Sequence, residues 1–359
     1  MREQVISRVV PLLREIEVAQ LNQLILCVQG VAMNNSNLPV KLIIQIPCFN
    51  EEHTLPQTIG DLPLTIEGID IIETLIIDDG STDRTIEVAK ELGVNHIIQN
   101  TNNRGLARSF RKGLDACLHF GADIIVNTDG DNQYAGWDIP KLVQPIIAGK
   151  AEIVIGDRET HKIERFSPLK KFLQKLGSRV VRQLSGTDIP DVVSGFRAIS
   201  REAALKLNII SPYSYTIEMV IQAGKKNMAL THVPISINDK TRESRLFKSI
   251  PSFVGRQLSS MIRMYAMYEP LRVFFYIGLV LSVIGVLPII RFLYFYFTVG
   301  GAGHLQSLVL GGVLLIIGFV TFMIGLVADL ISFNRQLTEI TLEKVRRMEL
   351  QQRPDSGDE

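Results

Sequence analysis

Between residues 41 and 240, short runs of β-branched and other apolar residues alternate with longer stretches in which apolar residues recur at helical spacing. The apolar runs predict strands at 41–47, 71–78, 94–99, 123–128 and 152–156. The stretches between them predict helices near 82–92, 104–120 and 138–149. Strands that alternate with helices are typical of the α/β class, so we expect residues 41–240 to form one domain around a mostly parallel, twisted sheet.

Two uncharged stretches follow this domain. Residues 273–290 carry no charge, and between Phe292 and Ala328 only His304 is able to carry one. A hydrocarbon core of about 30 Å requires about 20 helical residues. The pattern therefore predicts a hairpin of two transmembrane helices at 272–331, with crossings near 272–297 and 305–331.

The residues on either side of the hairpin predict its orientation and the remaining segments. Basic residues precede and follow the pair of crossings, and the loop between them has none; the flanking residues are Arg256, Arg263, Arg272, Arg335, Lys344, Arg346 and Arg347. Both ends are therefore expected in the cytoplasm, at the cell membrane. The other expected segments are an amphipathic N-terminal extension at 1–40, a juxtamembrane interfacial segment at 241–271 and a cytoplasmic tail at 332–359.

The composition agrees with a membrane protein and excludes one class of partner. The chain has 359 residues, of which 46% are hydrophobic and 21% charged, which is more apolar than an ordinary soluble enzyme. Its 38 basic and 37 acidic residues give a formal net charge of +1. A nucleic-acid partner is not expected, because such proteins carry an excess of positive charge.

Polar clusters follow three of the expected strands, at 47–52, 78–83 and 129–133. In open α/β sheets, ligands bind beyond the carboxyl ends of the strands. The clusters therefore predict one cleft built by three strand ends. Neither a dinucleotide fingerprint nor a P-loop follows the first strand, which argues against those two nucleotide sites.

The third cluster has the residue types of a metal site. Asp129, Asp131 and Gln133 alternate just beyond a strand, and in an extended segment this spacing directs the three side chains toward one side. Such oxygen ligands suit Mg²⁺ or Mn²⁺ bound to a diphosphate. A turn or a helix cap is the alternative interpretation.

The first two clusters have candidate nucleotide ligands and similar alternatives. Asp79 is a candidate acceptor for a nucleobase or ribose; the alternative interpretation of this cluster is that Ser81 or Asp83 only caps the next helix. Glu51 and Phe49 are either a ribose acceptor and a stacking surface, or a helix-start carboxylate and a core aromatic residue.

Together the motifs resemble a known family. They are IPCFNEE (46–52), IDDGSTD (77–83), NRGLAR (103–108), DGDNQ (129–133), GDR (156–158) and SGFR (194–197). The set resembles the family-two glycosyltransferases of the A-type fold. It is most similar to the branch that transfers sugars to polyprenyl phosphates, which includes dolichyl-phosphate mannose synthases and bacterial enzymes that place glucose on undecaprenyl phosphate.

The resemblance implies a role for individual residues. Those matching nucleotide-binding positions are Pro47, Phe49, Glu51, Asp79 and Asp129. Those matching the metal and diphosphate site are Asp129, Asp131 and Gln133. Those matching positions near the acceptor phosphate are Arg158, Arg197 and, as a weaker counterpart of an arginine, Lys171. Asp157 falls where related enzymes have an acidic candidate base or a serine, so the expected catalytic residues are Asp157, Asp131 and Arg158.

The reaction implied is transfer of a hexose, with glucose from UDP-glucose favoured, to undecaprenyl phosphate at the cytoplasmic membrane face. The resemblance further implies a metal-dependent inverting displacement by a homo-oligomer, for which a tetramer is reasonable. A mannose synthase that uses GDP-mannose is one alternative, and a processive polysaccharide synthase is another. A catalytically silent membrane scaffold is the non-enzymatic alternative.

Overall fold

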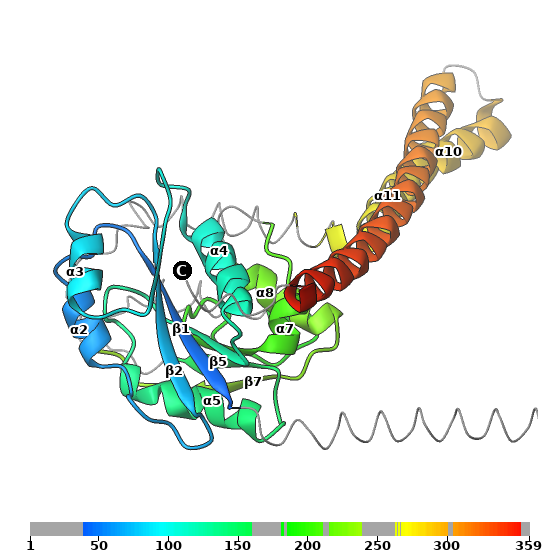
Figure 1. Ribbon diagram of the computed structural model, residues 1–359. Coiled ribbons are helices and arrows are strands. Elements are labelled where there is room, and N and C mark those ends of the chain that lie inside the picture. The colour runs from blue at the N-terminus through cyan, green and yellow to red at the C-terminus, as the bar shows by residue number, and fades with distance from the viewer. Residues whose placement is uncertain are drawn as a thin grey trace, which may run out of the picture.

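A mixed sheet of seven strands forms the centre of the α/β domain in the computed structural model (Figure 1). The structure describes residues 39–159, 181–182, 185–210, 215–238, 263, 265, 267–300 and 304–352. The strands are β1 (Lys41–Cys48), β2 (Ile71–Asp78), β3 (His96–Gln99), β4 (Ile124–Asn127), β5 (Ile153–Asp157), β6 (Arg197–Ser200) and β7 (Leu230–Pro234). Their order across the sheet is β3-β2-β1-β4-β6-β5-β7.

All neighbouring strands are parallel except at β6, which runs antiparallel to both β4 and β5. The first five strands occur where the apolar runs predict them, whereas β6 and β7 were not anticipated. Because β6 is inserted antiparallel between β4 and β5, those two strands have the same direction. The carboxyl ends of β1, β2, β4 and β5 therefore meet at one edge of the sheet.

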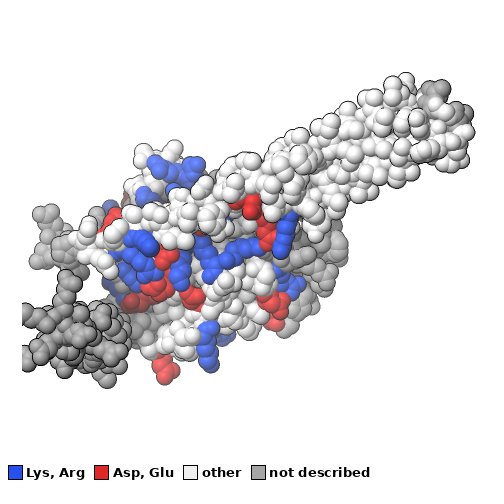
Figure 2. Space-filling view, turned by 90° about the vertical axis from the view of Figure 1, so that its right-hand side faces the viewer, with Lys and Arg blue, Asp and Glu red and all other residues white. Residues whose placement is uncertain are grey.

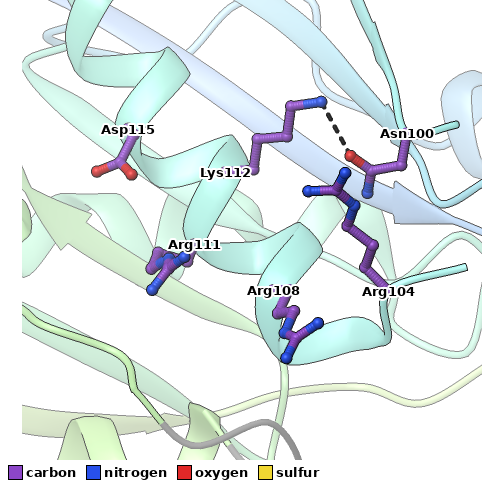
Figure 3. Close-up of a pocket in the computed structure, with 6 residues that line it drawn as sticks. All are labelled: Asn100, Arg104, Arg108, Arg111, Lys112 and Asp115. Carbon is purple, nitrogen blue, oxygen red and sulfur yellow. Dashed lines mark hydrogen bonds between the residues drawn. The ribbon is translucent and has the colours of Figure 1, made fainter. Parts of the chain in front are cut away.

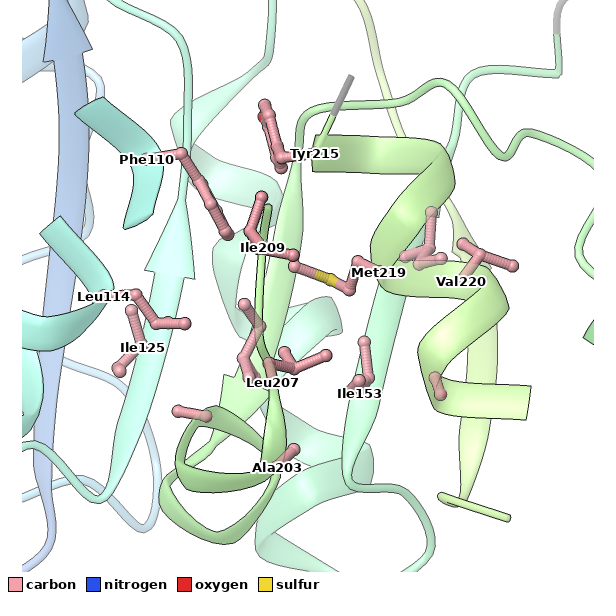
Figure 4. Packing of buried hydrophobic residues seen from close by; sticks show 14 of the residues in the cluster. Phe110, Leu114, Ile125, Ile153, Ala203, Leu207, Ile209, Tyr215, Met219 and Val220 are labelled. Atoms are coloured by element: carbon pink, nitrogen blue, oxygen red, sulfur yellow. The ribbon is translucent and has the colours of Figure 1, made fainter. Parts of the chain in front are cut away.

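Helices cover both faces of the sheet. Packed against one face are α4 (Leu106–His119), α7 (Arg201–Lys206) and α8 (Tyr215–Lys225). Packed against the other are α2 (Leu55–Gly60), α3 (Thr85–Glu91) and α5 (Ile139–Ile147), the last preceded by the short 3₁₀ helix η2 (Gly136–Asp138). Figure 4 shows the hydrophobic core between the sheet and the first group of helices, α4, α7 and α8. In this core Phe110 and Tyr215 stack with their ring centroids 4.0 Å apart.

The hairpin consists of α10 (Pro270–Val299) and α11 (Leu305–Gln352), which extend away from the α/β domain (Figure 1). Their most apolar windows have a mean hydropathy of 2.6 and are only 11% and 17% buried inside the protein. A core helix of a soluble protein would be mostly buried, and in Figure 2 the part of the hairpin that projects from the α/β domain shows no charged side chains on the face in view. Both helices are thus long and apolar enough to cross a membrane, as the sequence predicted.

Small residues allow the two helices to approach closely. A Cβ atom on Gly318 would lie 2.4 Å from the Ser282 hydroxyl oxygen and 2.8 Å from the Gly278 carbonyl oxygen. The buried positions of α11 recur every seven residues, at Gly311, Gly318, Gly325, Ser332 and Glu339. This period keeps one stripe of α11 against α10 and then directs the same stripe toward the α/β domain.

The helix α11 continues well past the expected end of the second crossing at residue 331, and its final turns pack against the α/β domain. Glu339 pairs with Lys226 at 2.9 Å, and an Arg346 N–H donates to the Leu207 carbonyl oxygen at 2.9 Å. Part of the segment predicted as a tail is therefore a helix that joins the hairpin directly to the sheet domain.

Candidate active site

The sheet edge brings the first two polar clusters into register. Cys48 at the end of β1 is opposite Asp78 at the end of β2, and the Asp79 N–H donates to the Cys48 carbonyl oxygen at 2.8 Å. Pro47 is buried within β1, and Phe49 is half-buried immediately after it. These residues therefore lie where the strand pattern placed them, at the carboxyl ends of adjacent parallel strands.

The loops that follow β1 and β2 are tied together by side-chain to backbone hydrogen bonds. The Asn50 N–H donates to the Ser81 hydroxyl oxygen at 2.8 Å, and the Thr82 N–H donates to the Asn50 side-chain oxygen at 2.8 Å. The Glu51 N–H donates to the Thr85 hydroxyl oxygen at 2.8 Å. Asn50 has a positive φ of 56°, which asparagine tolerates better than most residues. The hydrogen bonds fix Glu51 relative to the end of β2.

Glu51 also lies beside the loop that follows β4. It is 5% exposed, and the Thr54 hydroxyl oxygen is 2.7 Å from its Oε2 atom and 2.8 Å from the Gly130 carbonyl oxygen. A Cβ atom on Gly130 would be 3.0 Å from the Cys48 sulfur and 3.3 Å from the Glu51 Cγ atom. Burial, together with the nearby Glu51 carboxylate, raises the pKa of the Cys48 thiol well above its ordinary value. Cys48 is therefore a protonated packing residue at neutral pH and not a nucleophile.

Asp79 binds the backbone of a neighbouring loop. Its carboxylate accepts N–H bonds from the backbone of Arg104 at 2.9 Å and of Gly105 at 2.8 Å, and from the Asn100 side chain at 2.9 Å. A carboxylate has about four lone-pair sites, so three protein donors leave room for about one ligand donor. Asp79 thus positions the loop before α4 and retains limited capacity for the base or ribose contact that its motif predicts.

The third cluster places Asp131 and Gln133 in direct contact. The Gln133 side-chain amide donates to Asp131 Oδ2 at 2.9 Å, and its backbone N–H is 3.3 Å from Oδ1. Asn132 between them has φ 52° and donates its amide to Asp61 at 3.0 Å. Among the described residues, no three His, Cys, Asp or Glu side chains form a metal-binding group. The oxygen donors of Asp129 and Asp131 nevertheless fit Mg²⁺, which is commonly held by one or two carboxylates and substrate phosphates.

Asp129 belongs to a partly buried cluster with residues that the sequence analysis did not identify. A Cβ atom on Gly195 would be 3.2 Å from both Asp129 carboxylate oxygens and 3.1 Å from the Tyr215 hydroxyl oxygen. The Gly195 N–H donates to the Tyr134 hydroxyl oxygen at 2.9 Å. Burial, with a contribution from the Asp129 charge and against the opposing effect of Arg158, raises the pKa of Tyr134 to about 12, and burial also raises the pKa of Tyr215. Both tyrosines are therefore neutral at pH 7.

Arg158, directly after β5, forms an ion pair with Asp191. The distance from Nε to Oδ2 is 2.7 Å and that from Nη2 to Oδ1 is 2.9 Å. Burial opposes the charge of Arg158, but Tyr134 and Asp191 hold its pKa above the ordinary value, with a further contribution from Asp129. The guanidinium is thus a permanent cation at the same sheet edge as Asp129.

Asp157 ends β5 and is half-buried. Its Oδ1 atom accepts the Glu159 N–H at 2.9 Å, and its carbonyl oxygen accepts the Ile235 N–H at 3.0 Å. One carboxylate oxygen is therefore used to shape the turn after β5. The carboxyl end of β5 thus adds Asp157 and Arg158 to the edge formed by the ends of β1, β2 and β4.

The structure corrects the role expected for Arg197. This side chain is 0% exposed, and its guanidinium donates to three carbonyl oxygens, those of Val192, Ser194 and Thr216, at 2.8 to 2.9 Å. Burial lowers its pKa to about 10, so it remains charged at neutral pH. Arg197 binds the protein's own backbone and is not available to an acceptor phosphate. Lys171, the other expected acceptor ligand, is outside the described residues.

Some residues of this edge had weak sequence signals. Asp191 lies three residues before the quoted SGFR motif, and its pairing with Arg158 joins segments 33 positions apart. Gly195 is part of that motif, but its close approach to Asp129 depends on the antiparallel pairing of β6 with β4. A single sequence gives no direct sign of either contact.

Comparison with known proteins identifies the family of this chain. Residues 43–207 match the family model described as glycosyl transferase family 2. The chain is 32% identical over 53% of its length to a UDP-N-acetylglucosamine–dolichyl-phosphate N-acetylglucosaminyltransferase of Methanococcus voltae, covering 82% of that protein. It is 30% identical over 58% of its length to a dolichol-phosphate mannosyltransferase of Pyrococcus furiosus, covering 59% of that protein.

A solved structure is similar in fold. A mycobacterial protein superimposes with a TM-score of 0.50 at 19% identity, over 63% of this chain and 74% of that one. The family predicted from the motifs is therefore confirmed. The chain belongs to glycosyl transferase family 2, and the mixed sheet described above is its A-type catalytic domain.

Proposed function

We propose that this protein transfers a hexose from a nucleotide sugar to the phosphate of a polyprenyl lipid, with UDP-glucose and undecaprenyl phosphate as the favoured pair. The observation that carries the proposal is the position of the Arg158 cation beside Asp129, at the sheet edge shared with Glu51 and Asp79. This edge combines acidic ligands for a donor with a fixed positive charge for an anionic acceptor. The names of both relatives include a dolichyl or dolichol phosphate, which supports this acceptor class.

The acceptor chemistry reduces the need for a strong base. A phosphomonoester has a second pKa near about 6, so much of it is dianionic at neutral pH and already nucleophilic. The phosphate oxygen forms a bond to the anomeric carbon as the bond to the nucleoside diphosphate breaks, which inverts the configuration. Arg158 holds the acceptor phosphate in line, and Asp157 orients the group instead of acting as an obligatory base.

The donor side would use Asp129 and Asp131 as ligands of Mg²⁺ or Mn²⁺. When bound, such an ion neutralises the negative charge that develops on the departing diphosphate. Asp79, which keeps about one free acceptor position, and Glu51 would bind the nucleoside. Phe49 and Pro47 would border the same site from the end of β1.

The hairpin supports a lipid acceptor over a soluble one. It joins the A-type domain through α11, whose last turns pair with Leu207 and Lys226, so the domain is held at a fixed position relative to the apolar helices. With basic residues on both flanks and none in the connecting loop, we infer that the domain faces the cytoplasm. Nucleotide sugars and a membrane-bound phosphate would meet there.

The decisive experiment identifies the product. The full-length protein in lipid nanodiscs is incubated with undecaprenyl phosphate and one donor at a time, UDP-glucose, GDP-mannose or UDP-N-acetylglucosamine, with Mg²⁺, Mn²⁺ or EDTA. A glycosyl-phospholipid identified by mass, formed with UDP-glucose and lost in EDTA, supports the proposal. Product from GDP-mannose alone reassigns the donor, and full activity in EDTA removes the metal assignment.

Two variants test the residues in the same assay. Asp129→Ala and Asp131→Ala should abolish transfer while the protein still unfolds cooperatively, whereas Asp188→Ala, at an exposed aspartate, should leave transfer unchanged. Absence of lipid-dependent nucleotide release with every donor would favour a silent scaffold.

A further inference from the structure

A cluster of positive charge on α4 has no part in the proposed reaction. A cavity of about 170 Å³ is lined by Asn100, Arg104, Arg108, Arg111, Lys112 and Asp115 (Figure 3). Arg104 lies two residues before α4, and Arg108, Arg111 and Lys112 lie on one side of the first two turns of that helix. Four cations therefore border one small cavity.

Two of these cations have no partner among the described residues. Within the described part of the chain, the guanidinium groups of Arg104 and Arg108 make no hydrogen bond or ion pair, and both residues are exposed. The single carboxylate of the cavity, Asp115, is paired with Arg346 of α11 at 3.4 Å. The cavity thus retains uncompensated positive charge.

The polar groups deeper in the cavity are held in place. Lys112 donates to the Asn100 side-chain oxygen at 2.9 Å and to the Gln99 carbonyl oxygen at 3.0 Å. Asn100 is 4% exposed and in turn donates to Asp79 at 2.9 Å. The backbone N–H of Arg104 also donates to Asp79. One wall of the cavity is therefore preorganised, which reduces the entropy lost when a ligand binds.

From these observations we infer that the cavity binds the phosphate groups of a small soluble anion, at a site that adjoins Asp79 and is not lined by Asp129 or Asp131. Guanidinium groups donate paired hydrogen bonds to phosphate oxygens. A cavity of about 150 Å³ admits a molecule the size of benzene, so one or two phosphate groups fit the available space. The inference concerns binding and does not depend on the proposed transferase activity.

The position of the cavity favours a soluble anion over a lipid headgroup. Asp115 contacts Arg346, which lies about 22 Å along α11 beyond Ile331, given a rise of about 1.5 Å per residue. The headgroup layer extends only about 5 to 8 Å beyond the hydrocarbon core. With a crossing that ends near residue 331, as the sequence predicts, and with α11 perpendicular to the bilayer, the Asp115 end of the cavity lies beyond the headgroups.

Inorganic pyrophosphate is the probe for the test. Its binding to the full-length protein in phosphatidylcholine nanodiscs is measured by calorimetry in EDTA, so that metal-assisted binding at Asp129 and Asp131 is suppressed. We expect one site whose dissociation constant rises about tenfold or more in the double variant Arg104→Gln/Arg108→Gln. The matched control Lys90→Gln/Lys150→Gln, at exposed lysines of the same domain, should change the constant by less than about twofold.

Two further arms distinguish the possible sources of binding. Pyrophosphate binding should persist in Asp129→Ala and in nanodiscs that contain phosphatidylglycerol. Loss of binding in Asp129→Ala would place pyrophosphate at the strand-end site, and loss in the anionic nanodiscs would mean that lipid headgroups occupy the cavity. Each of these two losses would overturn the inference. It would also be overturned by unchanged binding in the double arginine variant or by the absence of binding to the unmodified protein.

Discussion

Arg158 and Asp191 form a two-point ion pair, with Nε 2.7 Å from Oδ2 and Nη2 2.9 Å from Oδ1. The Asp191 side chain is 2% exposed and that of Arg158 is 20% exposed. Two parallel hydrogen bonds fix the plane of a guanidinium as well as its position. The pair uses two of the five guanidinium N–H groups, so three remain for an acceptor phosphate.

Asp191→Asn should therefore impair acceptor binding through Arg158. The amide removes the buried negative charge and one of the two acceptors, which leaves the guanidinium without its fixed orientation. We expect the KM for polyprenyl phosphate to rise by about tenfold or more, with a smaller effect on donor KM. Steady-state kinetics with each substrate varied in turn provide the measurement.

The control for this variant is Asp188→Asn. Asp188 also pairs with an arginine, Arg182, at 2.8 Å, but its side chain is 93% exposed. An exposed pair of this kind contributes little, so the control should retain wild-type kinetics. Equal effects of the two variants on acceptor KM would contradict the positioning role of Asp191.

Gly195→Ala should disturb the carboxylate of Asp129. The added methyl group would lie 3.2 Å from both Asp129 oxygens and 3.1 Å from the Tyr215 hydroxyl oxygen, which is tighter than ordinary contact. We expect transfer activity to fall by about tenfold or more, because a small displacement of a reacting group is costly, with a stability loss of about 1–3 kcal/mol. Gly60→Ala, where nothing lies within 4 Å of the new methyl group, is the control. Activity assays and thermal unfolding of both variants separate the two effects.

Arg197→Lys should destabilise the fold without changing acceptor affinity. A lysine ammonium is unable to reproduce the planar fork that binds the Val192, Ser194 and Thr216 carbonyl oxygens. Leaving buried acceptors unsatisfied should cost about 1–3 kcal/mol, measured by denaturant unfolding. A large rise in acceptor KM with unchanged stability would restore the role that the SGFR motif suggested.

Local pattern was enough to predict five of the seven strands and the family. The first five strands, the loops at 47–52, 78–83 and 129–133, and the two apolar helices all follow from residues that are neighbours in the chain. Parallel strand direction then brings the loop clusters to one edge, as the register of Cys48 with Asp78 demonstrates. These features depend on periodicity and on the geometry of parallel sheets.

Contacts between distant segments were beyond such reasoning. The bond between Arg158 and Asp191, and the burial of Arg197, depend on the antiparallel strand β6. Nothing in the sequence near β6 distinguishes an arginine that binds phosphate from one that binds backbone carbonyls. The extension of α11 onto the sheet domain was missed for a similar reason, because its buried face depends on contacts with Leu207 and Lys226, the residues that directly follow α7 and α8.

Gly318→Ala should loosen the hairpin. Its methyl group would lie 2.4 Å from the Ser282 hydroxyl oxygen and 2.8 Å from the Gly278 carbonyl oxygen, so α10 and α11 must separate. We expect a stability loss of about 1–3 kcal/mol, seen as a lower midpoint of thermal unfolding in detergent. Gly312→Ala, in the same helix with nothing within 4 Å, should not lower the midpoint. Equal midpoints for the two variants would mean that this stripe does not hold the helices together.

The contact between α11 and α7 should weaken in acid. The Arg347 guanidinium donates to Glu202 at 3.0 Å, and this bond lowers the pKa of Glu202 below its ordinary value of 4.5 against the opposing effect of partial burial. A carboxyl group whose pKa is lowered on folding stabilises the folded state above its unfolded pKa. As the pH falls below 4.5, Glu202 in the unfolded chain takes up a proton before Glu202 in the folded protein does. The contribution to stability is therefore lost progressively until the pH has passed the lower pKa of the folded state.

The variant Arg347→Gln removes this bond together with the bonds that Arg347 donates to Glu343 within α11, and arginine itself does not titrate in that range. The difference in unfolding midpoint between the unmodified protein and Arg347→Gln should be present at pH 7 and should shrink toward zero below about pH 4. Lys344→Gln, at an exposed lysine one turn earlier on α11, should give a small difference that does not change over this interval. Apolar contact does not depend on the charge of a carboxyl group. A difference for Arg347→Gln that stays constant from pH 7 to pH 3 would therefore contradict the prediction. It would show that packing by the arginine stem, and not its bond to Glu202, joins α11 to the sheet domain.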